Sequence, residues 1–345
     1  MEIFIAFLIS TIITFLIIKY NYGLDKSVGD KDHAIHTHEV SRMGGVSIFI
    51  AIIFPIIFTS SEITILLIST FSIFTFGLLE DRYHIDISYL KKIIFISLSS
   101  FAILYISKEY AINGGFLILN LENIFEKYLA IFVAFIGMIG FASAINFVDG
   151  LNGYAMGIVS ITLIFFSYIF FENNLPEMFL LSTIMIGAIS GFIVFNFPFG
   201  KIFLGDMGAH WIGFFVAFIG IYLSNHTDIS LWYPLTALSI PVFETLVTVF
   251  RRIKRRIKNG VEFSESEKLH LHHLIYNVFE NIFPKNTKNW KINSTSSLFF
   301  IFWHTILNFI AFYFREDYAI LIFIFVLNLV IYLILYKGLR GKLLL

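Results

Sequence analysis

The chain has 345 residues, of which 58% are hydrophobic and only 14% are charged. Because the charged share is about half that of a soluble globular domain, the composition predicts an integral membrane protein. Basic and acidic residues balance, so net charge points to no class of partner, and no nucleic acid is expected. The absence of cysteine excludes disulfides, thiolate metal sites and a cysteine nucleophile.

Apolar stretches long enough to cross a membrane recur along the whole chain. Since a spanning helix needs about 20 mostly apolar residues, we expect an all-α polytopic membrane protein in one integral membrane domain, residues 1–345. The sequence predicts eleven transmembrane helices, at 3–19, 45–60, 63–79, 89–107, 129–146, 154–171, 177–195, 208–224, 232–250, 296–314 and 318–336. Only Ser60, Ser61 and Glu62 separate the second helix from the third.

Basic residues are divided unevenly between the two sets of connections. One set, with Lys19 and the tail after residue 336, holds 21 of the 24 lysines and arginines. It comprises the loops 20–44, 80–92, 147–153, 196–207 and 251–295. The positive-inside rule therefore makes this set cytoplasmic and predicts an external N-terminus and an internal C-terminus.

The most informative stretch, 142–157, interrupts two apolar runs with Asn146, Asp149, Asn152 and three glycines. A charged side chain at the centre of a bilayer costs about 2.5–3.5 kcal/mol on insertion scales, so a loop at the membrane face is expected. The spacing of three would place the polar side chains on one side of a helical turn. The alternative is that Asp149 or Asn152 simply caps the following helix.

A second polar segment runs from His36 to Gly45 and contains Arg42 just before Gly44 and Gly45. Glycine permits close backbone approach to an anion, and an arginine can hold a phosphate by two hydrogen bonds. The alternative is a helix start with an arginine that reaches the membrane surface.

Adjacent carboxylates end the third predicted helix at Glu80 and Asp81. Such a pair can bind a divalent cation, or one member can act as a base, although a solvated loop is the alternative.

The segment 195–208 carries Asn196, Lys201 and Asp206. Asp206 lies close to an expected helix N-terminus, which favours an anion or a metal-bridged phosphate; the alternative is a plain N-cap.

The basic loop 251–295 contains His270, His272 and His273. This spacing differs from that of helical zinc motifs, so we favour phosphate binding over a metal site. The arginine-rich start of the loop fits topology and anionic lipid. Glu244, inside a predicted helix, is expected to pair with Arg251 or Arg252.

Together these groups predict phosphate chemistry at the cytoplasmic face, with carboxylates for Mg²⁺ and basic groups for phosphate oxygens. A lipid or solute transporter would place charges near the bilayer centre. An intramembrane aspartyl protease would use Asp149 and Asp206 as a dyad. Both remain alternatives from the sequence alone.

Five motifs in order resemble the polyprenyl-phosphate hexose-1-phosphate transferases, also called glycosyltransferase family 4. They are His36 with Ser41–Gly45, Glu80-Asp81, Asn146–Gly153, Phe195–Gly208 and His270–His273. The departures are Ala34 for a common lysine, Ser41 for proline, Glu80 for aspartate, Asn152 for a third aspartate and Glu267-Lys268 for Asp-Arg. They bear on donor-sugar identity more than on reaction class.

The resemblance implies transfer of an N-acetylhexosamine 1-phosphate from a UDP-sugar to undecaprenyl phosphate, with release of UMP, at the cytoplasmic face of a bacterial inner membrane. It implies a glycan such as O-antigen of lipopolysaccharide; the peptidoglycan branch, which transfers phospho-MurNAc-pentapeptide, is the alternative.

Mg²⁺ is the implied cofactor, with Mn²⁺ as a substitute, on Asp206 and Asp149. The implied catalytic residues are Glu80, Asp81, Asp149 and Asp206. The implied substrate-binding residues are His36, Arg42, Asn146, Asn152, Asn196, Lys201, His270, His272 and His273. The lipid bilayer is a further partner, and the sequence gives no basis for an oligomeric state.

Overall fold

The protein is described by a computed structural model for residues 1–24, 39–83, 87–259 and 269–343. Every regular element within these ranges is a helix, and β-type pairing there is limited to isolated bridges such as Ser41 with Ile202. The predicted all-α class is therefore confirmed. His36 and Ala34 lie outside the described residues.

The helices follow one another with short connections. The first seven are α1 (Glu2–Lys19), α2 (Gly44–Ile57), α3 (Ser61–Ser69), α4 (Phe71–Tyr83), α5 (Tyr89–Ser107), α6 (Ile124–Val148) and α7 (Tyr154–Glu172). The others are α8 (Pro176–Asn196), α9 (Gly205–His226), α10 (Trp232–Ala237), α11 (Ser239–Asn259), α12 (Leu271–Ile282), α13 (Asn289–Tyr313) and α14 (Tyr318–Leu343).

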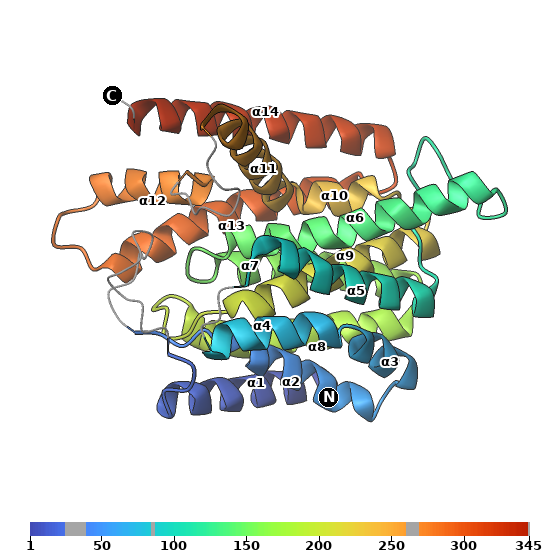
Figure 1. The fold of residues 1–345 in the computed structure, drawn as a ribbon, viewed down its shortest axis with the longest axis horizontal. Helices are drawn as coiled ribbons and strands as arrows, with labels where there is room; N and C mark the ends of the chain where they lie inside the picture. The colour runs from blue at the N-terminus through green and yellow to red at the C-terminus, as the bar shows by residue number, and fades with distance from the viewer. Residues whose placement is uncertain (25–38, 84–86, 260–268, 344–345) are drawn as a thin grey trace.

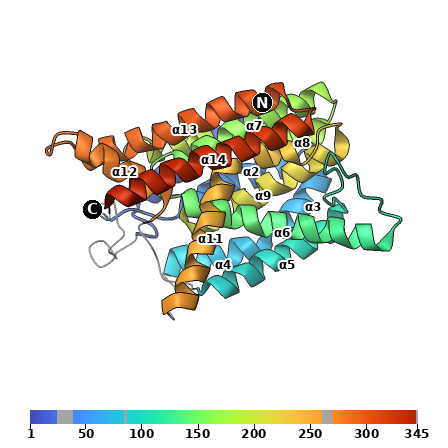
Figure 2. The ribbon, with the colours of Figure 1, turned by 90° about the horizontal axis from the view of Figure 1, so that it is seen from above.

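Most of the helices lie side by side along the long axis of the molecule, and α11 crosses them steeply (Figures 1 and 2). Helix α9 is the centre of the bundle: almost all of its residues are buried, and it packs on α6, α4, α2 and α7. Its N-terminus lies among the ends of several other helices. A side chain at that end can therefore meet groups from distant parts of the sequence.

Eight described helices are long and apolar enough to span a membrane, or nine if the pair α3 and α4 counts as one bent span. They confirm a polytopic membrane protein. The predicted helix 45–60 is the 14-residue α2, and the predicted helix 232–250 is divided into α10 and α11. The count of eleven and the orientation of the termini remain predictions.

The two divided helices have local causes. The bend of 50° between α3 and α4 falls at Thr70, whose hydroxyl donates to the carbonyl of Leu67 and accepts from Trp211 Nε1 at 2.8 Å. A hydroxyl that bonds back to the preceding turn is known to bend helices. The break at Leu238 comes three residues before Pro241, which lies in the first turn of α11 and lacks the N–H that a continuous helix would bond to the carbonyl of Ala237.

Helices α2 and α9 approach closely where two glycines face each other. A Cβ atom on Gly45 would lie 2.5 Å from the Cα of Gly208, so no larger residue fits at this position without movement. The contact holds the start of α2 against the start of α9. The segment that precedes α2, with Arg42, is thereby brought to the N-terminus of α9.

Candidate active site

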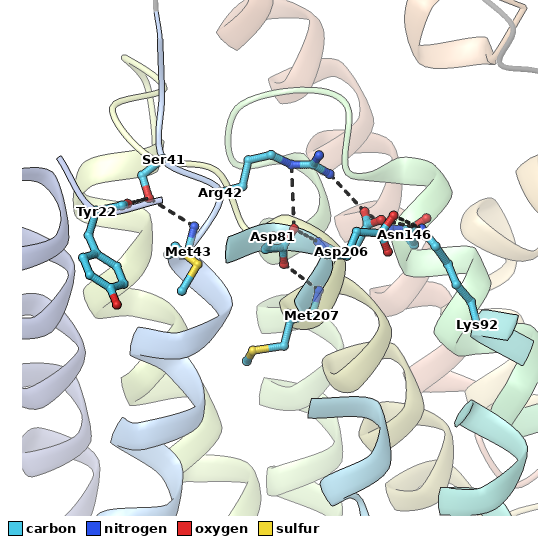
Figure 3. Close-up of polar contacts among 10 residues, drawn as sticks. Tyr22, Ser41, Arg42, Met43, Asp81, Lys92, Asn146, Asp206 and Met207 are labelled. Carbon is cyan, nitrogen blue, oxygen red and sulfur yellow. Dashed lines mark hydrogen bonds and ion pairs between the residues drawn. The ribbon is translucent and has the colours of Figure 1, made fainter. Parts of the chain in front are cut away.

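The carboxylate of Asp206, in the first turn of α9, receives three polar groups from three other segments (Figure 3). The Arg42 guanidinium Nη2 lies 3.2 Å from Oδ1, and Asn146 Nδ2 donates to the same oxygen at 3.0 Å. The Lys92 ammonium, from the start of α5, donates to Oδ2 at 2.6 Å. Residues 164 positions apart, such as Arg42 and Asp206, thus form one site.

Asp81, near the end of α4, caps α9 from another helix. Its two carboxylate oxygens accept hydrogen bonds from the backbone N–H groups of Asp206 at 3.0 Å and Met207 at 2.9 Å. The N-terminal N–H groups of a helix have no partners within the helix, and a carboxylate there also complements the helix dipole. Asp81 is only 1% exposed, so this capping fixes α4 on α9.

The backbone at Gly205 explains how the two carboxylates come so close. Gly205 has φ +79°, a left-handed conformation that side chains rarely adopt. A Cβ atom there would collide with the carbonyl oxygen of Arg42 and lie 2.5 Å from Asp81 Oδ2. Glycine at this position lets the chain turn into α9 while Arg42 and Asp81 lie against it.

Lys92 links Glu80 to Asp206. Its ammonium lies 2.7 Å from Glu80 Oε1 in addition to its contact with Asp206. The second oxygen of Glu80, Oε2, is buried and receives no hydrogen bond from any of the residues that the structure describes. A buried carboxylate oxygen without a donor is unfavourable, so this atom is available to a cation or a donor supplied by a ligand.

The segment before α2 is held to the loop before α9 by backbone hydrogen bonds. Phe203 N–H donates to the carbonyl of Ser41 at 2.8 Å, and Gly44 and Gly45 donate to the carbonyls of Phe203 and Leu204 at 3.0 and 2.7 Å. These bonds leave Arg42 between two anchored points. Its guanidinium reaches both Asp206 and Asp81, with Nε 3.8 Å from Asp81 Oδ1.

The loop between α6 and α7 brings a fourth carboxylate. Asp149 follows directly after α6 and lies close enough to Asp206 and Arg42 for their charges to act on it. Burial and the negative charge of Asp206 raise the pKa of Asp149 to about 7, against the opposing charge of Arg42. Asp149 therefore titrates in the neutral range.

Two asparagines predicted to contact substrate hold the loops of the site together. Asn196 accepts from Gly153 N–H at 2.6 Å and donates to the carbonyl of Ile202 at 2.7 Å. Asn152 donates from its side chain to the carbonyl of Pro198 at 2.9 Å. They join the loop after α6 to the loop after α8, and their part in substrate binding stays a prediction.

The histidines form a separate group beside this loop. The ring of His272 lies 5.4 Å from that of His270 and 4.3 Å from that of His273. A Cβ atom on Gly150 would collide with His272 Nε2, so this histidine lies against the loop that carries Asp149. Burial and its two histidine neighbours lower the pKa of His272, which keeps the ring neutral near pH 7.

Comparison with known proteins agrees with this arrangement of motifs. Residues 63–224 match glycosyl transferase family 4, and this range contains Glu80, Asp81, Asn146, Asp149 and Asp206. This part of the chain is similar to glycosyl transferase family 4. A probable undecaprenyl-phosphate N-acetylglucosaminyl 1-phosphate transferase of Bacillus subtilis is 28% identical over 283 residues, 79% of this chain and 76% of that protein.

Other relatives carry the name phospho-N-acetylmuramoyl-pentapeptide-transferase. One from Streptococcus uberis is 34% identical over 151 residues, 42% of this chain and 43% of that protein. One from Bacillus cytotoxicus is 26% identical over 239 residues, 64% of this chain and 74% of that protein. The chain thus matches less than half the length of the streptococcal relative.

The site at the start of α9 brings together most of the acidic and basic residues that the sequence singled out. Asp206 accepts hydrogen bonds from Arg42 and Asn146, and its backbone N–H donates to Asp81. Glu80 is joined to Asp206 through Lys92. Lys201 is exposed, and its ammonium lies 5.8 Å from the centre of the Phe199 ring. Its predicted contact with phosphate remains a prediction.

Two features of the site were not predicted. Lys92 was counted only as a topological charge, although it bridges two of the acidic residues. The prediction that Glu244 pairs with Arg251 or Arg252 is wrong. Among the described residues, Glu244 accepts hydrogen bonds from His270, Leu271 and Tyr332. Arg251 donates instead to the carbonyl of Leu269 and the hydroxyl of Tyr336.

The acidic cluster offers carboxylate oxygens, the type of ligand that Mg²⁺ takes. Four carboxylates, on Glu80, Asp81, Asp149 and Asp206, surround two cationic side chains, and Glu80 Oε2 lacks a donor. Within the described ranges, the one trio of possible ligand atoms closer than 4.8 Å belongs to Glu244, His270 and His272. Because Mg²⁺ commonly uses one or two carboxylates plus substrate oxygens, the acidic cluster fits this ion.

Proposed function

We propose that the chain transfers an N-acetylhexosamine 1-phosphate from a UDP-sugar to undecaprenyl phosphate and releases UMP. The observation that carries this proposal is the convergence of Arg42, Lys92 and Asn146 on Asp206 at the N-terminus of α9. A helix N-terminus that is lined by cations and carboxylates favours a phosphate with its metal. The Bacillus subtilis relative, matched over 76% of its length, bears the name of this activity.

In the proposed reaction, an oxygen of the lipid phosphate attacks the β-phosphorus of the UDP-sugar. The bond from this phosphorus to the bridging oxygen breaks, the electron pair leaves with UMP, and a lipid-linked diphosphate sugar forms. Asp206 and Asp149 are the residues that would hold Mg²⁺, which would neutralise charge on the donor diphosphate when bound. Arg42 and Lys92 are placed to neutralise charge on the phosphoryl oxygens.

The different contacts of Glu80 and Asp81 support a different role for each. Both oxygens of Asp81 accept backbone hydrogen bonds, which suits the positioning of Asp206. Glu80 has one oxygen without a donor and another on Lys92. We assign to Asp81 the alignment of α9 and to Glu80, through Lys92, the charge balance around the lipid phosphate.

A panel of donors tests the proposed function. Purified protein is incubated with undecaprenyl phosphate, Mg²⁺ and one of several UDP-sugars, among them UDP-GlcNAc, UDP-GalNAc and UDP-MurNAc-pentapeptide, and UMP is measured. We expect UMP with an N-acetylhexosamine donor. Release from UDP-MurNAc-pentapeptide alone would favour the peptidoglycan activity named for the streptococcal relative, and no UMP with any donor would reject both.

An intramembrane aspartyl protease is disfavoured by the contacts of Asp206. A protease dyad requires two carboxylates that share a proton. Asp206 instead contacts two cationic side chains and an amide, on both of its oxygens. This environment favours an ionised carboxylate that binds a cation or orients an anion.

A further inference from the structure

Glu244, in the second turn of α11, is 3% exposed, and both of its carboxylate oxygens accept hydrogen bonds. Its Oε1 accepts from His270 Nδ1 at 2.8 Å, and Leu271 N–H lies 3.1 and 3.2 Å from the two oxygens. Oε2 also accepts from the Tyr332 hydroxyl at 2.7 Å. Groups from α14 and from the start of α12 therefore fix one buried carboxylate on α11.

This carboxylate determines which nitrogen of His270 carries a proton. An ionised carboxylate only accepts hydrogen bonds, so the hydrogen lies on Nδ1. The other nitrogen, Nε2, then holds either a lone pair or, in the charged ring, a second hydrogen. The same bond fixes the plane of the ring, as a carboxylate does behind a functional histidine in many enzymes.

His270 lies beside the segment of the chain that carries Asn146 and Asp149. Its ring lies 6.0 Å from the ring of Phe147, the residue after Asn146. It also lies 5.4 Å from the ring of His272, which contacts Gly150 in the loop that carries Asp149. The ring therefore lies beside the segment 146–150, whose Asn146 and Asp149 belong to the acidic site.

We propose that Glu244 is a positioning residue that acts through His270. It fixes the Nδ1–H form and the ring orientation, so that Nε2 is presented to a phosphoryl oxygen of the bound substrates. This inference rests on the function proposed above, because it assumes that phosphoryl groups enter the acidic site. It assigns a role to a buried acid more than 30 residues from the nearest carboxylate of the acidic cluster in the sequence.

A zinc site is the competing interpretation, since Glu244, His270 and His272 offer ligand atoms within 4.8 Å of one another. Ligation by His270 Nδ1 would require loss of the hydrogen that it donates to Glu244. It would also compete with the Leu271 and Tyr332 hydrogen bonds to the same carboxylate. The hydrogen-bonded arrangement therefore favours the positioning role.

A double-mutant cycle tests the inference. Glu244→Gln keeps the size of the side chain and removes its charge. His270→Asn retains an amide that can donate to Glu244 and removes the group at Nε2. We expect each variant to lower kcat by about 10–100-fold, the range for residues that orient a functional histidine. The double variant should have the same kcat as the less active of the two single variants.

Additive losses in the cycle would overturn the inference, because they would mean that Glu244 acts independently of His270. Thr162→Val is the matched control: it removes the 3.0 Å partner of another buried histidine, His304, in the α7–α13 packing. We expect this control to lower the thermal midpoint without a change in kcat. A Glu244→Gln variant that behaves in the same way would also overturn the inference.

Nitrogen-15 NMR of histidine-labelled protein gives a readout that does not depend on activity. The His270 signals are assigned by their loss in His270→Asn. We expect a hydrogen on Nδ1 in the wild type and a changed pattern in Glu244→Gln. A neutral ring with its hydrogen on Nε2, or stoichiometric zinc in the purified protein, would overturn the inference; absence of UMP with every donor would instead reject the proposed function on which it rests.

Discussion

Asp81 and Asp206 face each other across the start of α9, where the side chain of the first accepts the backbone N–H of the second at 3.0 Å. The acid that caps the helix and the acid that the helix presents are thus parts of one unit. Because Asp81 accepts the backbone N–H of Asp206, the carboxylate of Asp206 does not have to cap the helix. That carboxylate instead accepts from Arg42, Lys92 and Asn146. The site therefore depends on the packing of α4 against α9.

Replacement of Asp81 tests this dependence. Asp81→Ala leaves two backbone N–H groups without partners, and we expect a loss of about 1–2 kcal/mol in stability, as for other helix caps. Turnover should fall as well, since the start of α9 is no longer fixed. Thermal unfolding in detergent and UMP release measure the two effects, and unchanged stability in this variant would show that the cap is unimportant.

Replacement of Lys92 tests the bridge between Glu80 and Asp206. In Lys92→Gln two partly buried carboxylates lose their shared cation. We expect turnover to fall by about 100-fold, comparable to the removal of one electrostatic contact to a transition state. Lys91→Gln is the control, because Lys91 is exposed on the same turn. Equal turnover in the two variants would exclude Lys92 from the site.

Asp149 should make the stability of the metal-free protein depend on pH. Its pKa is about 7 in the folded chain, whereas the ordinary pKa of an aspartate side chain, which applies to the unfolded chain, is 3.8. The folded protein therefore binds this proton more tightly. Stability from this group is therefore full below about pH 4 and is lost as the pH rises through 7. Thermal midpoints with chelator are measured for wild type and Asp149→Asn. Between pH 5 and 8 the thermal midpoint of the wild type should fall relative to that of Asp149→Asn. Midpoints that change with pH in the same way in both proteins would contradict the raised pKa.

Gly205→Ala tests the backbone conformation at the start of α9. The left-handed φ of +79° and the collision with the carbonyl of Arg42 oppose any side chain at this position. We expect a loss of stability of more than about 1 kcal/mol and a loss of most turnover. Gly137→Ala, where nothing lies within 4 Å of the added methyl group, is the control. A fully active Gly205→Ala variant would show that the turn tolerates a side chain.

The sequence was sufficient to predict the class of fold and the convergence of Arg42, Asn146 and Asp206, because polar motifs between apolar runs are easily recognised. It did not predict the role of Lys92, since a lysine at a membrane boundary usually serves topology. Thr70, at the bend between α3 and α4, accepts a hydrogen bond from Trp211, 141 residues away. Hydropathy carries no information about such a contact.

The role of Asp81 was also beyond the sequence. A helix cap is normally the residue just before the helix, whereas this cap comes from 125 residues earlier in the chain. Glu244 was assigned to nearby arginines because they lie two turns along the same helix. The structure pairs it with His270, 26 residues further on. In both cases a tertiary contact replaces the local partner that spacing favours.

The most direct test of the central claim compares UMP release by the wild type, Asp206→Asn and Asp228→Asn, each with Mg²⁺ and with chelator. Asp228 is an exposed acid just beyond the opposite end of α9, so it controls for loss of charge. We expect Mg²⁺-dependent release by the wild type and Asp228→Asn, and a loss of at least about 100-fold in Asp206→Asn. Wild-type turnover in Asp206→Asn, or turnover that is unaffected by chelator, would contradict a magnesium-dependent phosphate site at the start of α9.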